Sequence, residues 1–587
     1  MRFIFGFVGR RTIILLLLAS FTLSLFDLIG IATILPYLQI LSAKSSQSLD
    51  RLNEILGRLG AATPDHVTIV VLSSAGLAAF FLAKFALVYL INRYQLRTFA
   101  DITFRLNDRM FNMLMQSEYR LFLKSAGSEM IGIVHSATQH ATLCFQATVT
   151  TANEIMFLLL LTVGLMSIKP AATTIAIATI GAIGLMTYLV AVKRISRYGT
   201  QQQKLDIDRQ KLAFATANSI KDIKIMELEN LFAGKNAELA DVYRNITWRY
   251  QLLSNLPKII IEHMFVLVFI AGTTVAILWG MEVEMLLPVL GMIGLIALRV
   301  VPGLAKVISA YNSYRYSRIS MDRMLVLQQG LIAHSHKEQD VNMPFTRELS
   351  IDGVSFSYED HEVLSDLTMT IRRGQSVGIV GPSGSGKSTL LDVITGIQKA
   401  RSGAFKMDGV DIDPFETNVL KKKLGYVPQQ IALLDESIAF NITFEHYYDA
   451  ERLQNTLRIA NLQKFVESLP NGVGTLVGEG GVRLSGGQRQ RIGIARALYR
   501  NPEILVFDEA TSALDNITER ELSQEIQRLA GGMTIIQVAH RLTTIENCNV
   551  IHVMDKGRLV ASGTHAELLA GCSLYATMCH DQEAEKV

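Results

Sequence analysis

The sequence predicts a chain of two fold classes: an all-α domain of six membrane-spanning helices, followed by a domain of alternating β-strands and α-helices. Three observations predict this division. The chain has 587 residues, which suffices for several domains, and only 19% of them are charged. Its mean hydropathy of +0.28 indicates a membrane protein. Apolar residues are concentrated before about residue 310, and the remainder has an α/β character. The four cysteines show no paired or metal-binding spacing, so we expect neither disulfides nor zinc.

Six apolar runs are long enough to cross a bilayer as helices, which takes about 20 residues each. They occupy residues 13–41, 67–91, 146–167, 171–192, 256–280 and 285–305. The first run is too long for a signal-peptide core, so we expect a spanning helix there. The connections after the second and fourth runs are basic, whereas the loop between the fifth and sixth carries Glu282 and Glu284. The positive-inside rule therefore predicts that the amino terminus and the α/β domain lie on the inner side.

The domain boundaries follow from the change in composition. We expect a membrane domain at 1–326, a polar linker at 327–347 and an α/β domain at 348–587. Leucines at helical spacing within 43–62 predict an amphipathic helix on the outer side, either at the interface or packed as an ordinary loop helix. On the inner side, the stretches around 119–123 and 217–225 are each interpreted as a short helix against the α/β domain or as a solvated turn.

Several ionisable residues fall inside or beside the apolar runs, where an unpaired charge is costly. The acids are Asp27, Glu154 and Glu262, and the bases are Lys84, Lys258, Arg299 and Lys306. At about 1.5 Å per residue, Lys84 and Arg299 belong to the inner half of a hydrocarbon core about 30 Å thick. Two interpretations stay open. The bases bind an anionic head group taken from the inner leaflet, or they pair with the acids and so satisfy the buried charge.

A glycine-rich loop in the α/β half predicts a phosphate-binding site. The loop consists of Gly381, Pro382, Ser383, Gly384, Ser385, Gly386, Lys387, Ser388 and Thr389. It follows the apolar run 376–380 and precedes a segment with helical periodicity, and strand, loop and helix are the context that a P-loop requires. Its backbone N–H groups and the helix dipole attract phosphate oxygens. We expect Lys387 to reach the β- and γ-phosphates and the Ser388 hydroxyl to ligate Mg²⁺.

A second anion-binding nest and two consecutive acids follow further along the chain. The nest is formed by Ser485, Gly486, Gly487 and Gln488, which open a basic helix. Asp508 ends the buried strand 504–508, where a carboxylate suits Mg²⁺ held through water. Glu509 comes next and is placed to polarise an attacking water as a general base.

Three other side chains suit a nucleotide site. Gln429 offers an amide that senses Mg²⁺ and water, and His540 ends an apolar strand where it can contact the γ-phosphate. Tyr358 ends the predicted strand 349–358, upstream of the P-loop, where an aromatic ring can stack on adenine. For Tyr358, a surface position is an equally good interpretation.

With these motifs in this order, the chain resembles an ATP-binding cassette (ABC) exporter, and the resemblance covers residues 348–580. It implies that 381–389 is Walker A, Leu484–Gln488 the signature, Asp508 the Walker B acid, Glu509 the catalytic base, Gln429 the Q-loop glutamine, Ser512–Asp515 the D-loop and His540 the switch histidine. ATP and Mg²⁺ are the implied cofactors, with Ser388, Gln429 and Asp508 at the metal. In this family ATP lies between Walker A of one subunit and the signature of another. One chain has one of each, so we expect a half-transporter that forms a homodimer, with a heterodimer as the alternative.

The membrane half is similar to the lipid-linked oligosaccharide flippases of this family. The similarity rests on Asp27 before Pro36, Lys84, Leu256-Pro-Lys258 with Glu262, and Arg299-Val-Val-Pro302 with Lys306. It implies that an anionic lipid head group meets Lys84, Lys258, Arg299 and Lys306. We therefore expect ATP-driven flipping of an amphipathic anionic lipid, first of all a lipid-linked oligosaccharide, by alternating access. The alternatives are a drug, peptide or lipid A exporter, or an ATP-gated channel or receptor. We expect a multi-pass protein of a bacterial inner membrane, with the ATPase domain in the cytoplasm and no nucleic-acid partner.

Overall fold

The structure, a computed structural model, describes residues 7–42, 66–124, 127–168, 194–195, 197–202, 204–280, 283–333, 338–509, 533–539 and 542–584. The chain divides into two compact units. The first, the helical unit, comprises Met1–Met115 and Ser125–Ala333. The second, the α/β unit, comprises His334–Val587 together with the short segment Gln116–Lys124. The segment Gln116–Lys124 thus belongs to the same unit as His334–Val587, which begins more than two hundred residues later in the sequence.

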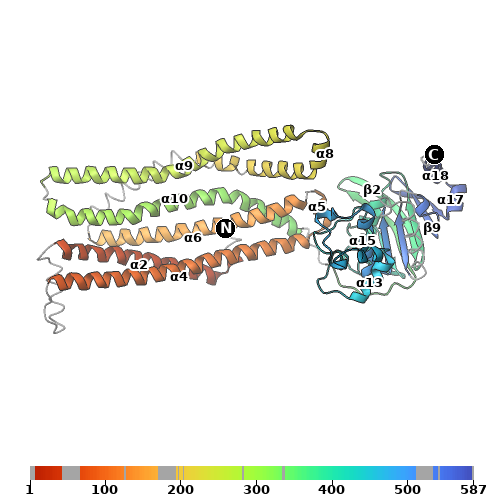
Figure 1. The fold of residues 1–587 in the computed structure, drawn as a ribbon, viewed down its shortest axis with the longest axis horizontal. Coiled ribbons are helices and arrows are strands. Elements are labelled where there is room, and N and C mark those ends of the chain that lie inside the picture. Colours follow the sequence, from red (N-terminus) through yellow and green to blue (C-terminus); the bar gives the residue numbers. More distant parts are fainter. Residues whose placement is uncertain are drawn as a thin grey trace. The chain divides into compact units, whose positions relative to one another are not determined.

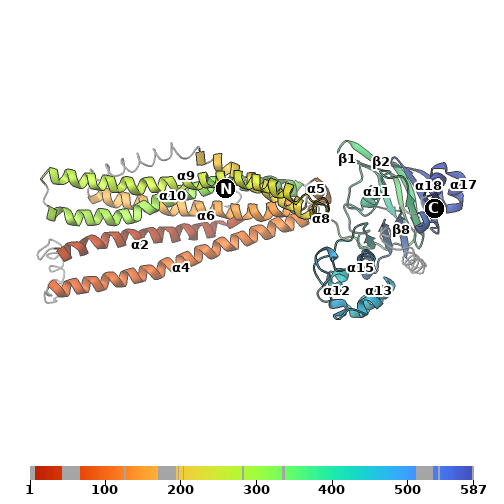
Figure 2. The ribbon, with the colours of Figure 1, turned by 45° about the horizontal axis from the view of Figure 1, so that its top comes forward.

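The helical unit is built from long helices that run side by side (Figures 1 and 2). These are α2 (Arg10–Ser42), α4 (His66–Met115), α6 (Gly127–Ile168), α9 (Glu229–Leu278) and α10 (Val283–Ala333), with the short α8 (Ile220–Ile225) before α9. Large apolar side chains such as Leu82, Phe85 and Leu267 are exposed on them, and a helix satisfies every backbone polar group internally, as a bilayer requires. Helix α6 packs against α2, α4 and α10, and Phe157, Leu161 and Val300 form a small core between them.

Four of the described helices are long and apolar enough to cross a membrane, within Arg10–Ile34, Val67–Met115, Thr138–Gly164 and Glu229–Leu278. They contain most of the runs predicted at 13–41, 67–91, 146–167 and 256–280. The run at 285–305 lies in α10, whereas 171–192 and the outer segment 43–62 lie outside the described residues. The number of six spans therefore stays a prediction.

Two helices are much longer than the spans predicted for them. Helices α4 and α9 have 50 residues each, which at about 1.5 Å per residue is about 75 Å. A hydrocarbon core is about 30 Å thick, so more than half of each helix extends beyond it. Helix α10 likewise continues to Ala333, into the range expected to be a linker. After it, Glu338 and Asp340 form ion pairs with Lys421 and Lys422 of the α/β unit.

The α/β unit contains two sheets. The antiparallel sheet has the order β2-β1-β4-β5, with β1 (Glu348–Tyr358), β2 (His361–Arg372), β4 (Ser402–Met407) and β5 (Val410–Ile412). The other sheet has the order β10-β9-β3-β8-β7-β6, with β3 (Ser376–Val380), β6 (Leu424–Val427), β7 (Ile504–Asp508), β8 (Thr534–Val538), β9 (Val550–Asp555) and β10 (Arg558–Gly563). All its neighbours pair in parallel except β9 and β10. The carboxyl ends of β3, β6 and β7 therefore meet at one edge, where ligands bind in such sheets.

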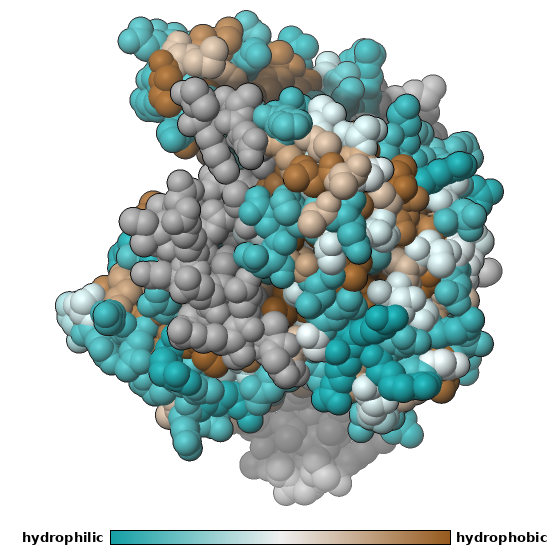
Figure 3. All heavy atoms as spheres, turned by 90° about the vertical axis from the view of Figure 1, so that its right-hand side faces the viewer, coloured by the Kyte–Doolittle hydropathy of each residue, from teal (hydrophilic) through white to brown (hydrophobic). Residues whose placement is uncertain are grey.

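Helices and loops complete the α/β unit. They include α5 (Tyr119–Lys124), α11 (Lys387–Ile394), α12 (Ile438–Thr443), α13 (Ala450–Ile459), α14 (Gln463–Glu467), α15 (Gly486–Tyr499), α17 (His565–Gly571) and α18 (Ser573–Ala584). One apolar core joins the two sheets to α11, and another joins α12, α13 and α15 to the sheet edge. The face in Figure 3 is largely hydrophilic with small apolar patches, as expected for a domain in water.

Asp408 anchors the entry to β1. Its carboxylate accepts hydrogen bonds from the backbone N–H groups of Thr346, Arg347 and Glu348, at 2.6 to 2.9 Å. Burial alone would raise the pKa of Asp408, but these bonds and the Thr346 hydroxyl outweigh it and lower the pKa to about 2.

Candidate functional site

The loop between β3 and α11 is shaped to hold phosphate. Gly384 and Gly386 have φ of +78° and +98°, a conformation that favours glycine. A Cβ on Gly381 would lie 2.2 Å from the carbonyl oxygen of Met554, so the loop also needs glycine for close packing. The Ser385 hydroxyl is buried, and it has no hydrogen-bond partner among the described residues. A buried donor left open in a glycine-rich loop before a helix fits an anionic ligand.

Lys387 is held over this loop by the loop itself. Its ammonium group donates to the carbonyl oxygens of Gly381 and Pro382, at 2.9 and 3.0 Å. Burial lowers the pKa of Lys387, and the carboxylates of Glu509 and Asp508 oppose this effect. The cation is therefore buried and fixed against the loop where the sequence predicts the phosphates.

The parallel sheet brings Gln429, Asp508 and Glu509 together. Asp508 ends β7, and Glu509 follows it with φ of +51°. The Gln429 amide donates to Oε2 of Glu509 at 2.6 Å, across 80 residues of sequence. Burial raises the pKa of Asp508, and a hydrogen bond from the Tyr426 hydroxyl at 3.0 Å lowers it. Tyr426 was not among the predicted site residues, although a polar side chain in a strand that leads to Gln429 was a usable signal.

The donor set of the predicted metal site fits Mg²⁺. Ser388, Gln429 and Asp508 offer a hydroxyl, an amide and a carboxylate, which are the hard oxygen ligands that this ion prefers. Within the described part of the chain, no three His, Cys, Asp or Glu side chains converge on a common point. A metal held by these three side chains would take its remaining ligands from nucleotide phosphates and water, as Mg²⁺ does in such sites.

Tyr358 ends β1 close to the P-loop helix. Its ring contacts Phe356 edge-on, with the ring centroids 4.8 Å apart. Burial raises the pKa of Tyr358, the Asp392 and Tyr119 groups add to this effect, and a hydrogen bond with Thr389 opposes it. The predicted adenine-stacking residue thus lies beside Thr389, the last residue of the predicted Walker A segment.

The predicted signature residues form the start of helix α15. Ser485 is its N-cap, and its hydroxyl accepts from the backbone N–H of Gln488 at 3.2 Å. The Gln488 side chain accepts from the backbone N–H of Ser485 at 2.8 Å, which completes a capping box. Gly486 and Gly487 form the first turn. His540 and the predicted D-loop, 512–515, lie outside the described residues.

Five of the ionisable residues predicted at membrane depth form one connected network from four helices. Arg299 of α10 binds Asp27 of α2 through Nε and Nη2, at 2.9 and 2.8 Å, and Glu154 of α6 through Nη1, at 2.8 Å. Lys84 of α4 pairs with Asp27 at 2.8 Å, and Lys306 pairs with Glu154 at 3.3 Å. Two of the three predicted acids and three of the four predicted bases are thus in contact.

Two further features complete this network. The Arg299 guanidinium lies 4.2 Å from the ring centroid of Phe157, which the sequence did not single out. A Cβ on Gly303 would lie 2.9 Å from Oε2 of Glu154, so a glycine leaves room for the carboxylate. Lys258, in contrast, is exposed on α9 and lies 3.9 Å from Glu262, four residues further along the same helix. The structure does not bring Lys258 into the network.

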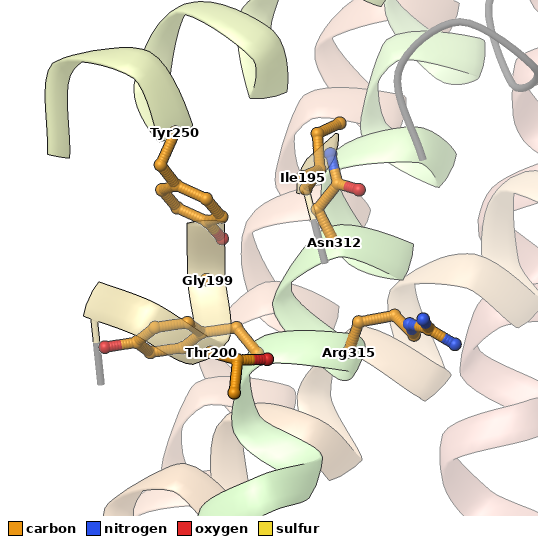
Figure 4. A pocket seen from close by; sticks show the side chains of 7 residues that line it. Ile195, Gly199, Thr200, Tyr250, Asn312 and Arg315 are labelled. Atoms are coloured by element: carbon orange, nitrogen blue, oxygen red, sulfur yellow. The ribbon is translucent and has the colours of Figure 1, made fainter. Parts of the chain in front are cut away.

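A small hollow in the helical unit lies between α9, α10 and residues 195–200 (Figure 4). It contains about 210 Å³ of empty space and is lined by Ile195, Gly199, Thr200, Tyr250, Asn312, Arg315 and Tyr316. In the close-up, Tyr250 and Asn312 approach it from different helices. It is too small for a lipid, and none of the predicted site residues lines it.

The comparisons with known proteins agree with this geometry. Residues 364–512 match the ABC transporter family. With 24% identity and a TM-score of 0.78, the fold matches the structure of a bacterial Atm1-family ABC exporter with ATP bound, over 98% of this chain and 99% of the other. The chain therefore shares the fold of that exporter, a helical domain followed by an α/β domain, and the stretch that matches the ABC transporter family lies in the α/β domain.

The similar curated proteins include ATP-dependent lipid A-core flippases. The protein of this name from Bordetella avium (strain 197N) is 44% identical over 235 residues, which cover 40% of each chain. The one from Burkholderia pseudomallei (strain K96243) is 28% identical over 506 residues, or 84% of this chain and 83% of the other. The match thus spans only about two fifths of some relatives, where identity is highest, and most of the length of others.

Proposed function

We propose that two copies of this chain hydrolyse ATP and use it to move an amphipathic anionic lipid across a membrane. The observation that supports the proposal is the edge of the parallel sheet, where the loop after β3 has an open buried hydroxyl and Gln429, Asp508 and Glu509 lie at or just after the ends of β6 and β7. Backbone N–H groups and Lys387 bind phosphate oxygens there. Ser388, Asp508 and Gln429 are the residues that would hold Mg²⁺, which neutralises charge on the phosphates.

Glu509 is the proposed general base. Its carboxylate is oriented by the Gln429 amide at 2.6 Å, and it accepts a proton from the attacking water. Each chain carries one P-loop and one LSGGQ signature, so we propose that a second copy completes each of two sites. ATP then favours the closed pair of ATPase domains, and hydrolysis restores the open pair. This coupling is a population shift set by a difference in ATP affinity between the two states.

The test of the ATPase is Glu509→Gln, which keeps the shape of the side chain and removes the base. Losing a general base costs about 100- to 10,000-fold in rate, so we expect turnover to fall at least 100-fold while ATP binding survives. The measurement is phosphate release and ATP retention by the full chain in liposomes. Turnover within tenfold of the wild-type rate would remove Glu509 from this role.

The charge network supports an anionic substrate. The network contains three cations and two carboxylates, so it has a net charge of one positive unit. The Lys306 side chain is 58% exposed, whereas the Glu154 side chain is only 3% exposed. All of the hydrogen bonds and ion pairs described for the Arg299 fork go to acids, so we assign it to holding those acids in place. Lys84 and Lys306 are the proposed head-group contacts, and a lysine binds a phosphate as a point charge. Lys258 lies outside the network, and we propose that it contacts the head group only before the substrate reaches Lys84 and Lys306.

A panel of substrates distinguishes the candidates. Lipid-linked oligosaccharides and lipid A-core molecules share phosphate groups, sugars and acyl or prenyl chains, and the names of the relatives point to the second. We expect either one to stimulate the ATPase in liposomes, and Lys84→Gln with Lys306→Gln to abolish stimulation but not basal hydrolysis. Stimulation by neutral drugs alone would count against an anionic lipid. A sustained ATP-dependent conductance would instead favour a channel.

A further inference from the structure

Tyr426 reaches the Walker B carboxylate because of strand register. Strand β6 pairs with β7 in parallel, with Tyr426 opposite Val506. Asp508 is two residues beyond Val506, and side chains at this spacing lie on the same face of a sheet. A diagonal neighbour on the same face is within reach of an aromatic side chain. The Tyr426 hydroxyl accordingly donates to Oδ2 of Asp508 at 3.0 Å.

We propose that Tyr426 is a positioning residue for the Mg²⁺ that accompanies ATP, an inference that rests on the proposed function. Its hydroxyl holds one carboxylate oxygen of Asp508 and so stops rotation of the carboxylate. Oδ1 then remains to accept from the water shell of the metal. A hydrogen bond that orients a ligand in this way typically contributes 10- to 100-fold to metal affinity.

The same tyrosine lies near groups on other elements. The Asp392 carboxylate of α11 and the Tyr119 hydroxyl of α5 are both close enough to act on it electrostatically. The hydrogen bond to Asp508 is the contact of the Tyr426 hydroxyl that carries the inference. An ordinary buried tyrosine that merely satisfies its hydroxyl would affect stability and leave the metal untouched, and this difference is measurable.

The test uses Mn²⁺, which reports its own binding by electron paramagnetic resonance. Full chains in lipid nanodiscs carry Glu509→Gln to retain ATP, with or without Tyr426→Phe. We expect Tyr426→Phe to weaken Mn²⁺ binding to the ATP complex about tenfold. ATP affinity measured in EDTA should stay within twofold, which also shows that the variant is folded.

The matched control is Tyr499→Phe. Tyr499 is a buried tyrosine of the same unit whose hydroxyl accepts from the backbone N–H of Asp449 at 3.2 Å. We expect it to change thermal stability only. Equal Mn²⁺ affinities for Tyr426→Phe and its parent would overturn the inference. So would an equal loss in Tyr499→Phe. If the parent itself holds no Mn²⁺ and ATP, the proposed function fails together with this inference.

Discussion

Replacing Arg299 by methionine tests whether the intramembrane network stabilises the helical unit. Methionine has a similar length and keeps an apolar contact with Phe157, but it removes two hydrogen bonds and one further ion-pair contact to two carboxylates. Those carboxylates are on α2 and α6, so the substitution removes contacts that join α10 to two other helices. Removing one partner of a buried ion pair costs about 3–5 kcal/mol when the other charge is left uncompensated.

The expected cost is below this range because each acid keeps one lysine. Asp27 retains Lys84 at 2.8 Å, and Glu154 retains Lys306 at 3.3 Å. However, Glu154 is almost fully buried and Lys306 is largely exposed, so this compensation is poor. We therefore take about 2 kcal/mol, which at about 2–4 °C per kcal/mol lowers the melting temperature by about 4–8 °C.

The assay is thermal unfolding of the full chain in detergent, followed by tryptophan fluorescence and by loss of monodisperse protein. The control is Arg318→Met, on the same helix, because Arg318 and Asp322 form an exposed pair at 3.7 Å, four residues apart. Such pairs contribute about 0.3–0.5 kcal/mol, so the control should shift by no more than about 2 °C. Adding Glu154→Gln to Arg299→Met should recover part of the loss. Equal shifts for the two arginine variants would refute the reasoning.

Two other predictions concern the α/β unit. Ser485→Asp keeps an N-cap acceptor but places a negative charge in the anion nest, so we expect unchanged stability and loss of ATPase activity. The control is Thr564→Ala, which removes the capping box of α17 and should cost about 1 kcal/mol of stability with activity intact. If ATPase activity survives Ser485→Asp, Ser485 is not part of the nucleotide site. Because the folded pKa of Asp408, about 2, is below its ordinary value of 3.8, its stabilisation is present above about pH 4 and is lost as the pH falls toward 2. The difference in melting temperature between the wild type and Asp408→Asn should therefore shrink over this interval, and a difference independent of pH would contradict the assignment.

The local features of the chain could be predicted from sequence because they depend on neighbours along it. Walker A, the strand that ends in Asp508 and the cap at Ser485 each need only a short stretch with the right glycines, apolar residues and polar ends. The apolar runs are equally local, and those in the described residues lie in helices. The extent of α4 and α9 was underestimated, because hydropathy marks the part of a helix that is in lipid and is silent about where the helix ends.

Contacts between distant residues were decided only by the folded chain. The sequence named Asp27, Lys84, Glu154, Lys258 and Arg299 without showing which of them meet, since helix packing and rotation select the partners. Packing joined Arg299 to both acids and left Lys258 with a neighbour on its own helix. Register in the parallel sheet likewise placed the Tyr426 hydroxyl on Asp508, and no spacing along the chain encodes that pair. Composition and short motifs thus indicate the class of protein, whereas the packing of helices and strands determines which charged side chains pair.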